Sequence, residues 1–449
     1  MNIVPFVHEG LGNSSYLIEI GDDNALLVDP DRSFDRYSRA ADERRWRIVG
    51  VLETHVHADF VTGAVEAIST VGAPVFHPAD AACRYPHQAM RGGETFTIAG
   101  VEIGPIASPG HTPEHMSYVL RTAAGPPLLF SGGSLIVGGA ARTDLISPER
   151  TDELTRKQYH TLREAFASLP DETILYPTHG GGSFCSTGAG VDRWSTLGEE
   201  RANNPALAVA DEREFVEWFP KTFPAAPVYF FRMRAFNQAG PRLRRDVAKP
   251  PALSPSAFER RARDGLIIDA RSVESYSAAH IRNSLHVEFR DSFAVWLGWL
   301  VPAETALLFV LDPATLQDVL NEALLVGYEN FAGWLDGGID SWIASGRPVS
   351  STEFVSGEAA RAVIAEGADV LDVREDNEYA ERHARNAMHI PLGKLQEQPL
   401  GGKPSTPVVV YCGHGERAST AASLLERSGR RRIVNVRGGL DALDANEQE

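Results

Sequence analysis

The stretch of the chain that decides the fold of its first part is Thr54-His55-Val56-His57-Ala58-Asp59. It follows an apolar run at residues 48–52, which predicts a buried strand. A strand that ends in His-x-His-x-Asp places two imidazoles and a carboxylate on one short loop. Because Zn²⁺ and Fe²⁺ take imidazole nitrogen and carboxylate oxygen as ligands, the stretch indicates a metal centre.

Two further histidines stand beside glycines in turns that also follow strand-like runs. They are His111, in Ser108-Pro109-Gly110-His111-Thr112, and His179, in Tyr176-Pro177-Thr178-His179-Gly180. One His-x-His pair is a weak signal for a metal. Three such turns in this order are a strong one.

Length, charge and cysteine usage limit the class of protein. The chain has 449 residues, which predicts several domains, and its net charge of −17 argues against a general nucleic-acid binder and against an anionic membrane as partner. The three cysteines, Cys83, Cys185 and Cys412, are too few for a disulfide framework. With neither a signal peptide nor an apolar span in view, we expect a cytoplasmic protein.

The chain divides by composition into four parts. Residues 1–200 alternate short strands with outer helices, which predicts an αββα sandwich within an overall α/β fold. Repeated prolines at 201–250 indicate an arm or linker, and its aromatic residues indicate that it packs against something. Residues 251–350 and 351–449 form the last two parts.

These last two parts are copies of one another. Matching residues recur at one constant spacing, in the pairs Asp269 and Asp372, Tyr276 and Tyr379, His280 and His383, and His286 and His389. Such a register indicates two copies of a domain of roughly a hundred residues. Apolar runs alternate with helical segments in each copy, which predicts α/β domains with parallel sheets.

The second copy carries a nucleophile loop, Cys412-Gly413-His414-Gly415-Glu416-Arg417, between a buried strand and a helix. Backbone N–H groups and the positive end of the helix dipole stabilise a thiolate at such a turn. We therefore expect Cys412 and Arg417 to be catalytic, with Arg417 holding an anionic substrate. Residues Gly413, His414, Gly415 and Glu416 are the expected substrate-binding residues.

This loop resembles that of the rhodanese family of sulfurtransferases, whose active loop runs Cys-x-x-Gly-x-Arg. Leu371-Asp372-Val373-Arg374-Glu375 matches the second marker of that family. The resemblance implies that Cys412 carries a sulfane sulfur as a persulfide. The first copy has no cysteine at residues 307–315, so we expect it to be catalytically silent, with a structural or docking role.

Residues 1–200 resemble the metallo-β-lactamase superfamily, its persulfide dioxygenase branch and bacterial fusions of that branch with rhodanese domains. The motifs around His55, His111 and His179 carry the likeness. It implies one Fe²⁺ that oxidises a persulfide with O₂ to sulfite, held by His55, His111 and an aspartate. Here Gly133 stands where the family has that aspartate, and Phe60 stands where two-metal members have a further histidine.

The leading hypothesis is persulfide oxidation coupled to sulfur transfer through Cys412, on a low-molecular-weight persulfide or a thiosulfate-type substrate. The first alternative is a zinc hydrolase of thioesters, with His55, His57 and His111 as ligands, and Asp59 and His179 orienting them or a water. The second is a metal-free first domain beside an active sulfurtransferase. The expected cofactor is thus one Fe²⁺ or Zn²⁺, or a weak or empty site.

Cys185, close to His179 in the sequence, is either a pocket residue that accepts sulfur or an ordinary buried thiol. The sequence predicts no nucleic-acid or membrane partner and leaves a homo-oligomer open.

Overall fold

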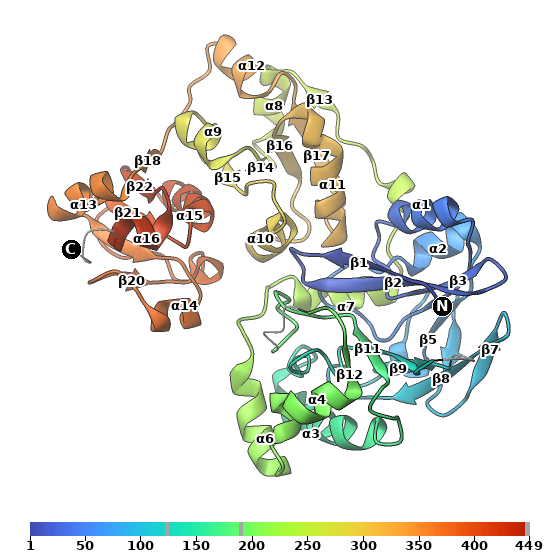
Figure 1. Ribbon diagram of the computed structural model, residues 1–449. Helices are drawn as coiled ribbons and strands as arrows, with labels where there is room; N and C mark the ends of the chain where they lie inside the picture. The colour runs from blue at the N-terminus through green and yellow to red at the C-terminus, as the bar shows by residue number, and fades with distance from the viewer. Residues whose placement is uncertain (122–124, 188–191, 445–449) are drawn as a thin grey trace. The chain divides into compact units, whose positions relative to one another are not determined.

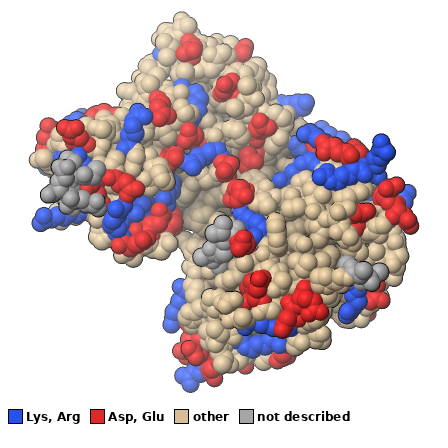
Figure 2. Space-filling model, in the orientation of Figure 1, with Lys and Arg blue, Asp and Glu red and all other residues tan. Residues whose placement is uncertain are grey.

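The computed structural model describes residues 1–121, 125–187 and 192–444, which form two compact units. The first unit comprises Met1–Val247 with Ala323–Gly327, and the second comprises Ala248–Glu322 and the chain from Tyr328 onward. None of the described helices is long and apolar enough to cross a bilayer. Figure 2 shows acidic and basic side chains interspersed on the visible face of the molecule.

Two six-stranded sheets form the centre of the first unit. The first sheet contains, in order, β1 (Ile3–His8), β2 (Asn13–Gly21), β3 (Asn24–Val28), β4 (Arg47–Leu52), β5 (Val75–Pro78) and β6 (Gln88–Met90). The second contains β12 (Ser195–Thr196), β11 (Ile174–Pro177), β10 (Leu128–Gly132), β9 (Met116–Leu120), β8 (Val101–Ala107) and β7 (Phe96–Ile98). Buried residues from both sheets, such as Tyr16, Leu52, Tyr118 and Phe130, share one core.

Helices cover the outer faces of this sandwich, as Figure 1 shows. Helices α1 (Asp35–Arg44) and α2 (Ala64–Val71) pack their apolar residues with those of the first sheet. Helix α3 (Thr151–His160), continued by η3 (Thr161–Ala165), packs beside the second sheet. The αββα sandwich predicted from the sequence is therefore confirmed.

The segment expected to be an arm between domains lies in the first unit as far as Val247. It forms α4 (Leu197–Asn203), α5 (Pro205–Ala208), α6 (Glu212–Trp218) and α7 (Phe230–Ala239), with η4 (Phe219–Thr222) and η5 (Arg244–Asp246). Phe215 and Phe219 are fully buried in a core shared with α3 and the second sheet. Burial of these rings, each worth about 1.5–3 kcal/mol, fixes the segment to the domain, in agreement with the expectation that its aromatic residues pack against something.

The second unit contains two five-stranded parallel sheets with the same strand order. The first runs β13 (Ala252–Leu253), β17 (Phe331–Leu335), β16 (Leu307–Val310), β14 (Leu266–Asp269) and β15 (Leu285–His286). The second runs β18 (Glu353–Val355), β22 (Ile433–Val436), β21 (Val408–Tyr411), β19 (Asp369–Asp372) and β20 (Met388–His389). The predicted duplication is thus visible strand by strand.

Helices surround each of these sheets. The first copy has α8 (Pro255–Arg261), α9 (Val273–Ala278), α10 (Phe293–Leu300), α11 (Leu316–Leu325) and α12 (Gly338–Ala344). The second has α13 (Gly357–Ala365), α14 (Asp376–Glu381), α15 (Glu416–Arg427) and α16 (Gly439–Asp444).

The repeat extends to side-chain packing. Tyr276 stacks on His280 and His286 at centroid distances of 4.0 and 4.3 Å. In the second copy Tyr379 stacks on its two histidines at 3.9 and 4.1 Å. The same three-ring stack therefore supports both sheets.

Candidate metal centre and thiol site

Three imidazoles from separate loops of the first unit meet in its interior. His55 follows β4, His111 lies between β8 and β9, and His179 follows β11. All three are buried, and their ligand atoms lie within 4.8 Å of one another.

Hydrogen bonds fix which ring nitrogen is free in two of the three histidines. The Thr54 hydroxyl donates to Asp29 and so accepts from His55 Nδ1, at 2.8 Å. His111 Nδ1 donates to the carbonyl oxygen of Arg142 at 2.6 Å. Nδ1 therefore carries the proton in His55 and His111, and their Nε2 atoms present lone pairs, which is how metal-binding histidines are usually oriented. His179 Nδ1 lies 3.3 Å from the Asp59 carboxylate.

The three Nε2 atoms fit a bound cation. His55 Nε2 and His179 Nε2 are 3.3 Å apart, close to the roughly 3.3 Å expected between two nitrogens of a tetrahedral Zn²⁺ site with Zn–N bonds of about 2.0–2.1 Å. His111 Nε2 is buried without a hydrogen-bond partner among the described residues. A buried imidazole nitrogen without a partner is unfavourable, and a cation held by the three Nε2 atoms would satisfy it.

His57 is bound differently from the other three. Its Nε2 lies 3.0 Å from Glu53 Oε2 and 3.5 Å from Asp29 Oδ1. Burial alone would lower the pKa of His57, but these carboxylates raise it to about 10. By contrast, burial and the neighbouring imidazoles hold the pKa values of His55 and His111 well below the ordinary value.

The expected ligand set therefore differs from the observed cluster in one member. Among the described residues, no metal-compatible group contains His55, His57 and His111 together, and His179 takes the place of His57. Asp59 was expected to support the site, and together with His57 and His179 it forms another set of side chains close enough to hold a metal ion. Its carboxylate oxygens have no hydrogen-bond partner in the described chain. A carboxylate is thus available beside the three imidazoles.

The backbone at Gly133 leaves no room for the aspartate ligand expected at this position from the resemblance to persulfide dioxygenases. A Cβ atom built there would lie 2.5 Å from His111 Cδ2 and 3.0 Å from Ala141 Cβ. The backbone N–H of Gly133 donates to His115 Nε2 at 2.9 Å, so His115 has no free nitrogen to offer a metal on this side. Asp144, a conceivable substitute, is held instead by both guanidinium nitrogens of Arg142 at 2.7 and 2.8 Å.

The two cysteines of the first unit are poor nucleophiles. Cys185 is fully buried, and burial together with the nearby Asp59 charge raises the pKa of its thiol well above the ordinary value. Its place near Asp59 keeps it a candidate pocket residue. Cys83 is half-buried, 3.6 Å from His77 Nε2, and burial raises its pKa to about 11.

The thiol of Cys412 lies at the end of β21, just before α15. The backbone N–H of Gly415 donates to its Sγ at 3.1 Å. The side chain is buried, while His414 in the same loop is exposed. A hydrogen bond from a backbone amide at the start of a 12-residue helix is the environment that favours thiolate or persulfide.

Arg417 is fixed beside this thiol by an ion pair. Its two terminal nitrogens donate to Glu378 at 2.6 and 2.7 Å. Burial opposes the charge, but Glu378 and the nearby Cys412 raise the pKa of Arg417, so the guanidinium is always charged. The predicted pair of Cys412 and Arg417 therefore lies on one loop, with Glu378 as a partner that the sequence did not reveal.

The first copy places Leu311 where the second has Cys412. Leu311 follows β16 as Cys412 follows β21, and it is buried. The first copy also contacts the active-type loop directly, since Arg290 pairs with Glu416 at 2.6 Å. Farther along α15, the hydroxyl of Ser423 accepts from the backbone N–H of His286 at 3.0 Å.

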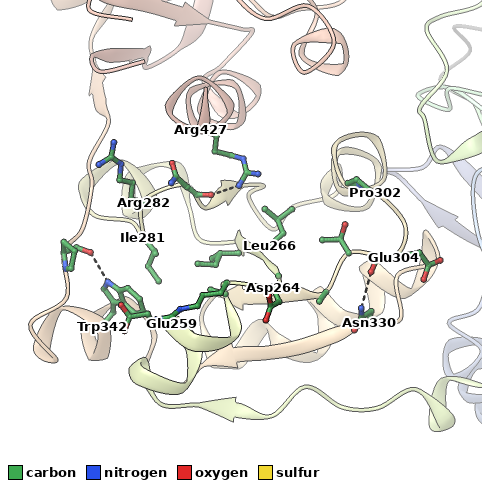
Figure 3. A pocket seen from close by; sticks show the side chains of 18 residues that line it. Glu259, Asp264, Leu266, Ile281, Arg282, Pro302, Glu304, Asn330, Trp342 and Arg427 are labelled. Carbon is green, nitrogen blue, oxygen red and sulfur yellow. Dashed lines mark hydrogen bonds between the residues drawn. The ribbon is translucent and has the colours of Figure 1, made fainter. Parts of the chain in front are cut away.

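A cavity of about 1010 Å³ lies in the second unit (Figure 3). It is lined by Leu266, Ala306 and Asn330 at the amino ends of β14, β16 and β17, and by Arg427 of α15. Ligands of parallel α/β sheets bind at the carboxyl ends of the strands. We therefore place the sulfur chemistry at the Cys412 loop, which follows a carboxyl end, and not in this cavity.

The sequence analysis missed several residues around the candidate metal centre. Asp29 directly follows β3 and Glu53 directly follows β4, and because these strands are parallel, both carboxylates reach the His57 ring. That pairing was a usable signal, because parallel strands bring their carboxyl ends together. Asn237 of α7 and Tyr229, just before α7, contact the loop that carries His57 and Asp59, and nothing in their local sequence indicates this.

Comparison with known proteins agrees with this division of the chain. Residues 8–179 match the metallo-beta-lactamase superfamily, and residues 254–345 and 356–446 match the rhodanese-like domain. A metallo-beta-lactamase structure from Staphylococcus aureus superposes with a TM-score of 0.67 at 26% identity, covering 75% of this chain and 98% of that one.

Two curated relatives match part of the chain. A hydroxyacylglutathione hydrolase of Pseudomonas entomophila is 36% identical over 30% of this chain and 48% of its own length. The persulfide dioxygenase ETHE1 of Homo sapiens is 28% identical over 43% of this chain and 70% of its own length. The chain thus spans about half the length of the first relative.

Proposed function

Because the chain joins a metallo-β-lactamase domain to two rhodanese-like domains, we propose that it is a sulfur-metabolism enzyme that transfers sulfane sulfur through a persulfide on Cys412. One observation carries the proposal. Cys412 Sγ accepts a backbone N–H at the start of α15, and the charged Arg417 lies in the first turn of that helix.

The geometry suits the two half-reactions of sulfur transfer. The Cys412 thiolate attacks the outer sulfur of thiosulfate, the sulfur–sulfur bond of the donor breaks, and sulfite leaves with the bonding electrons. The Gly415 N–H, which donates to Sγ, stabilises the negative charge of the attacking thiolate. A nucleophilic acceptor, such as cyanide or a thiolate, attacks that sulfur and restores the cysteine thiolate. Arg417 holds the anionic donor in place.

For the first unit we propose a mononuclear metal centre held by His55, His111 and His179, with Asp59 beside it. A metal bound there would supply Lewis acidity and open positions for a thiol-derived substrate. Thr54 and the Arg142 carbonyl orient the rings of His55 and His111, Asp59 lies 3.3 Å from His179 Nδ1, and burial excludes bulk water from all three rings. The His57 ring is held between Glu53 and Asp29, so we assign it to fixing the loop and not to binding the metal.

The proposed reaction of this unit is oxidation of a low-molecular-weight persulfide by O₂ and water, giving the thiol, sulfite and two protons. The likeness to persulfide dioxygenase ETHE1 and the fusion to a sulfur-transfer domain support it. Tethering supports it too, because a linked domain receives the intermediate at high effective concentration.

Hydrolysis of a glutathione thioester is the second candidate, favoured by a specific observation. The three facing ligands are all imidazoles, as in many catalytic zinc sites, whereas non-haem iron oxygenases use two histidines and a carboxylate. The 36% identity to a hydroxyacylglutathione hydrolase agrees with it.

Two measurements on the purified full chain test these proposals. Incubation with thiosulfate should add one sulfur atom to the peptide that contains Cys412, as seen by mass spectrometry, and an unchanged mass would remove the transfer function. For the first unit, bound iron with O₂ consumption on glutathione persulfide supports oxidation. Bound zinc with thioester cleavage supports hydrolysis and overturns the oxidation proposal.

A further inference from the structure

Helix α7, which the sequence placed in an arm between domains, lies against the loop that carries His57 and Asp59. We infer that α7 holds this loop in its metal-binding form, with Asn237 as the principal positioning residue. The inference rests on the proposed metal site, and it assigns a role to a segment outside the region that matches the metallo-beta-lactamase superfamily.

Asn237 uses its whole side-chain amide on the loop. Its nitrogen donates to the carbonyl oxygens of His57 and Phe60, both at 2.9 Å. Its oxygen accepts the backbone N–H of Thr62 at 3.0 Å. The side chain is 2% exposed, so water does not offer these groups an alternative partner.

Two neighbours of Asn237 on the same segment complete the contact. The Tyr229 hydroxyl, just before α7, donates to the carbonyl oxygen of Asp59 at 2.9 Å. Arg234 donates through both terminal nitrogens to Glu114, at 2.8 and 2.9 Å. Glu114 in turn accepts the backbone N–H of Val56 at 3.1 Å.

Backbone groups of residues 56, 57, 59, 60 and 62 thus find their partners in α7, in Tyr229 or in a carboxylate that α7 holds. The loop is buried and has no regular secondary structure over most of its length, so a sheet cannot satisfy these groups. Without α7, the backbone would turn toward other partners, and the Asp59 and His57 side chains would move with it. The same loop begins at His55, so the ligand geometry depends on it as well.

The test is zinc affinity of the full chain, stripped of metal and titrated with Zn²⁺ against a colorimetric chelator. Asn237→Ala should raise the zinc dissociation constant by about 10–100-fold, the usual effect of removing a partner that orients a metal site. Tyr229→Phe removes a single hydrogen bond and should raise the dissociation constant less. Cobalt(II) in place of zinc gives a second readout, because its absorption bands report ligand geometry and should shift in Asn237→Ala.

Asn204→Ala is the matched control. Asn204 is also 2% exposed, its nitrogen donates to the carbonyl oxygens of Ile136 and Gly139 and to the Glu200 carboxylate, and its oxygen accepts the N–H of Ala206. The Asn204→Ala substitution also removes a buried side-chain amide from the first unit, but it leaves the loop that carries His57 and Asp59 untouched. Zinc affinity in this variant should stay within about twofold of the wild type, as for independent sites.

Equal losses of affinity in Asn237→Ala and Asn204→Ala, or no loss in either, would overturn the inference while leaving the metal site in place. If Asn237→Ala does not fold, Tyr229→Phe decides, and wild-type affinity and cobalt spectrum in that variant would overturn it. A wild-type chain that binds neither Zn²⁺ nor Co²⁺ would overturn the metal site and this inference together.

Discussion

The two rhodanese-like copies have the same strand order and the same tyrosine–histidine stack, yet only one has a nucleophile loop. After β21 the chain runs Cys412-Gly413, and the N–H of Gly415 is free to donate to sulfur. After β16 it runs Leu311-Asp312-Pro313, where proline has no N–H and the Asp312 side chain accepts the N–H of Ala314.

The difference shows that the parallel sheet does not itself provide sulfur chemistry. What the second copy adds is a short loop in which the backbone N–H of Gly415 donates to a thiol. The first copy keeps its sheet and core and still packs on α15 through Arg290 and the backbone of His286. A domain can therefore lose its reactive group and keep a structural role.

The largest effect is expected from Cys412→Ser. A serine hydroxyl does not form a stable persulfide equivalent, so thiosulfate:cyanide sulfur transfer should fall by at least about a thousandfold. Initial rates of thiocyanate formation measure it. Cys83→Ser and Cys185→Ser are the controls and should keep wild-type rates, and equal rates in Cys412→Ser would exclude Cys412 as the sulfur carrier.

Arg417→Ala should follow, because it removes the cation that faces an anionic donor. Loss of a charge-assisted contact of about 1.5–3 kcal/mol predicts a KM for thiosulfate about 10–150-fold higher. Such a rise in KM would show that the second copy depends on Arg417 as well as on Cys412, so that two residues would distinguish it functionally from the first copy. Arg417→Lys should recover part of the loss, and a KM unchanged in Arg417→Ala would show that donor binding does not use this side chain.

A smaller effect is expected from Arg290→Ala in the silent copy. It leaves the Glu416 carboxylate unpaired beside the loop, so the KM for thiosulfate should rise by about 2–5-fold, the range of a solvent-exposed ion pair. Salt screens such pairs, so the effect should vanish at about 1 M NaCl. Arg282→Ala, in the same copy, is the control, and equal KM values at low salt would deny the first copy any influence on catalysis.

The smallest effect is expected from Leu311→Cys made in the Cys412→Ser background. Without a donor N–H and an arginine near it, the new thiol should add no sulfur transfer above background, although removing a buried leucine side chain costs stability, about 1–3 kcal/mol. The same thiocyanate assay checks it, with thermal unfolding alongside. Measurable turnover would mean that the sheet provides the chemistry after all.

The sequence predicted most of the fold, because its signals are local or periodic. The repeat register, the strand runs and the Cys412 loop all lie in contiguous stretches. The role of 201–247 was not predictable in this way, since the partners of Phe215 and Asn237 lie far away in the chain. The place of His179 in the cluster instead of His57 was also hidden, because Glu53 and Asp29 decide which way the His57 ring is bound.

The contact between Gly133 and His111 limits what can be engineered at this position. The ring of His111 occupies the space that a side chain at position 133 would need, so an aspartate introduced there would meet an imidazole before it met a metal. To make room, His111 would have to move and give up its bond to the Arg142 carbonyl. Redesign of the centre is therefore better begun from the histidines than from a new carboxylate at position 133.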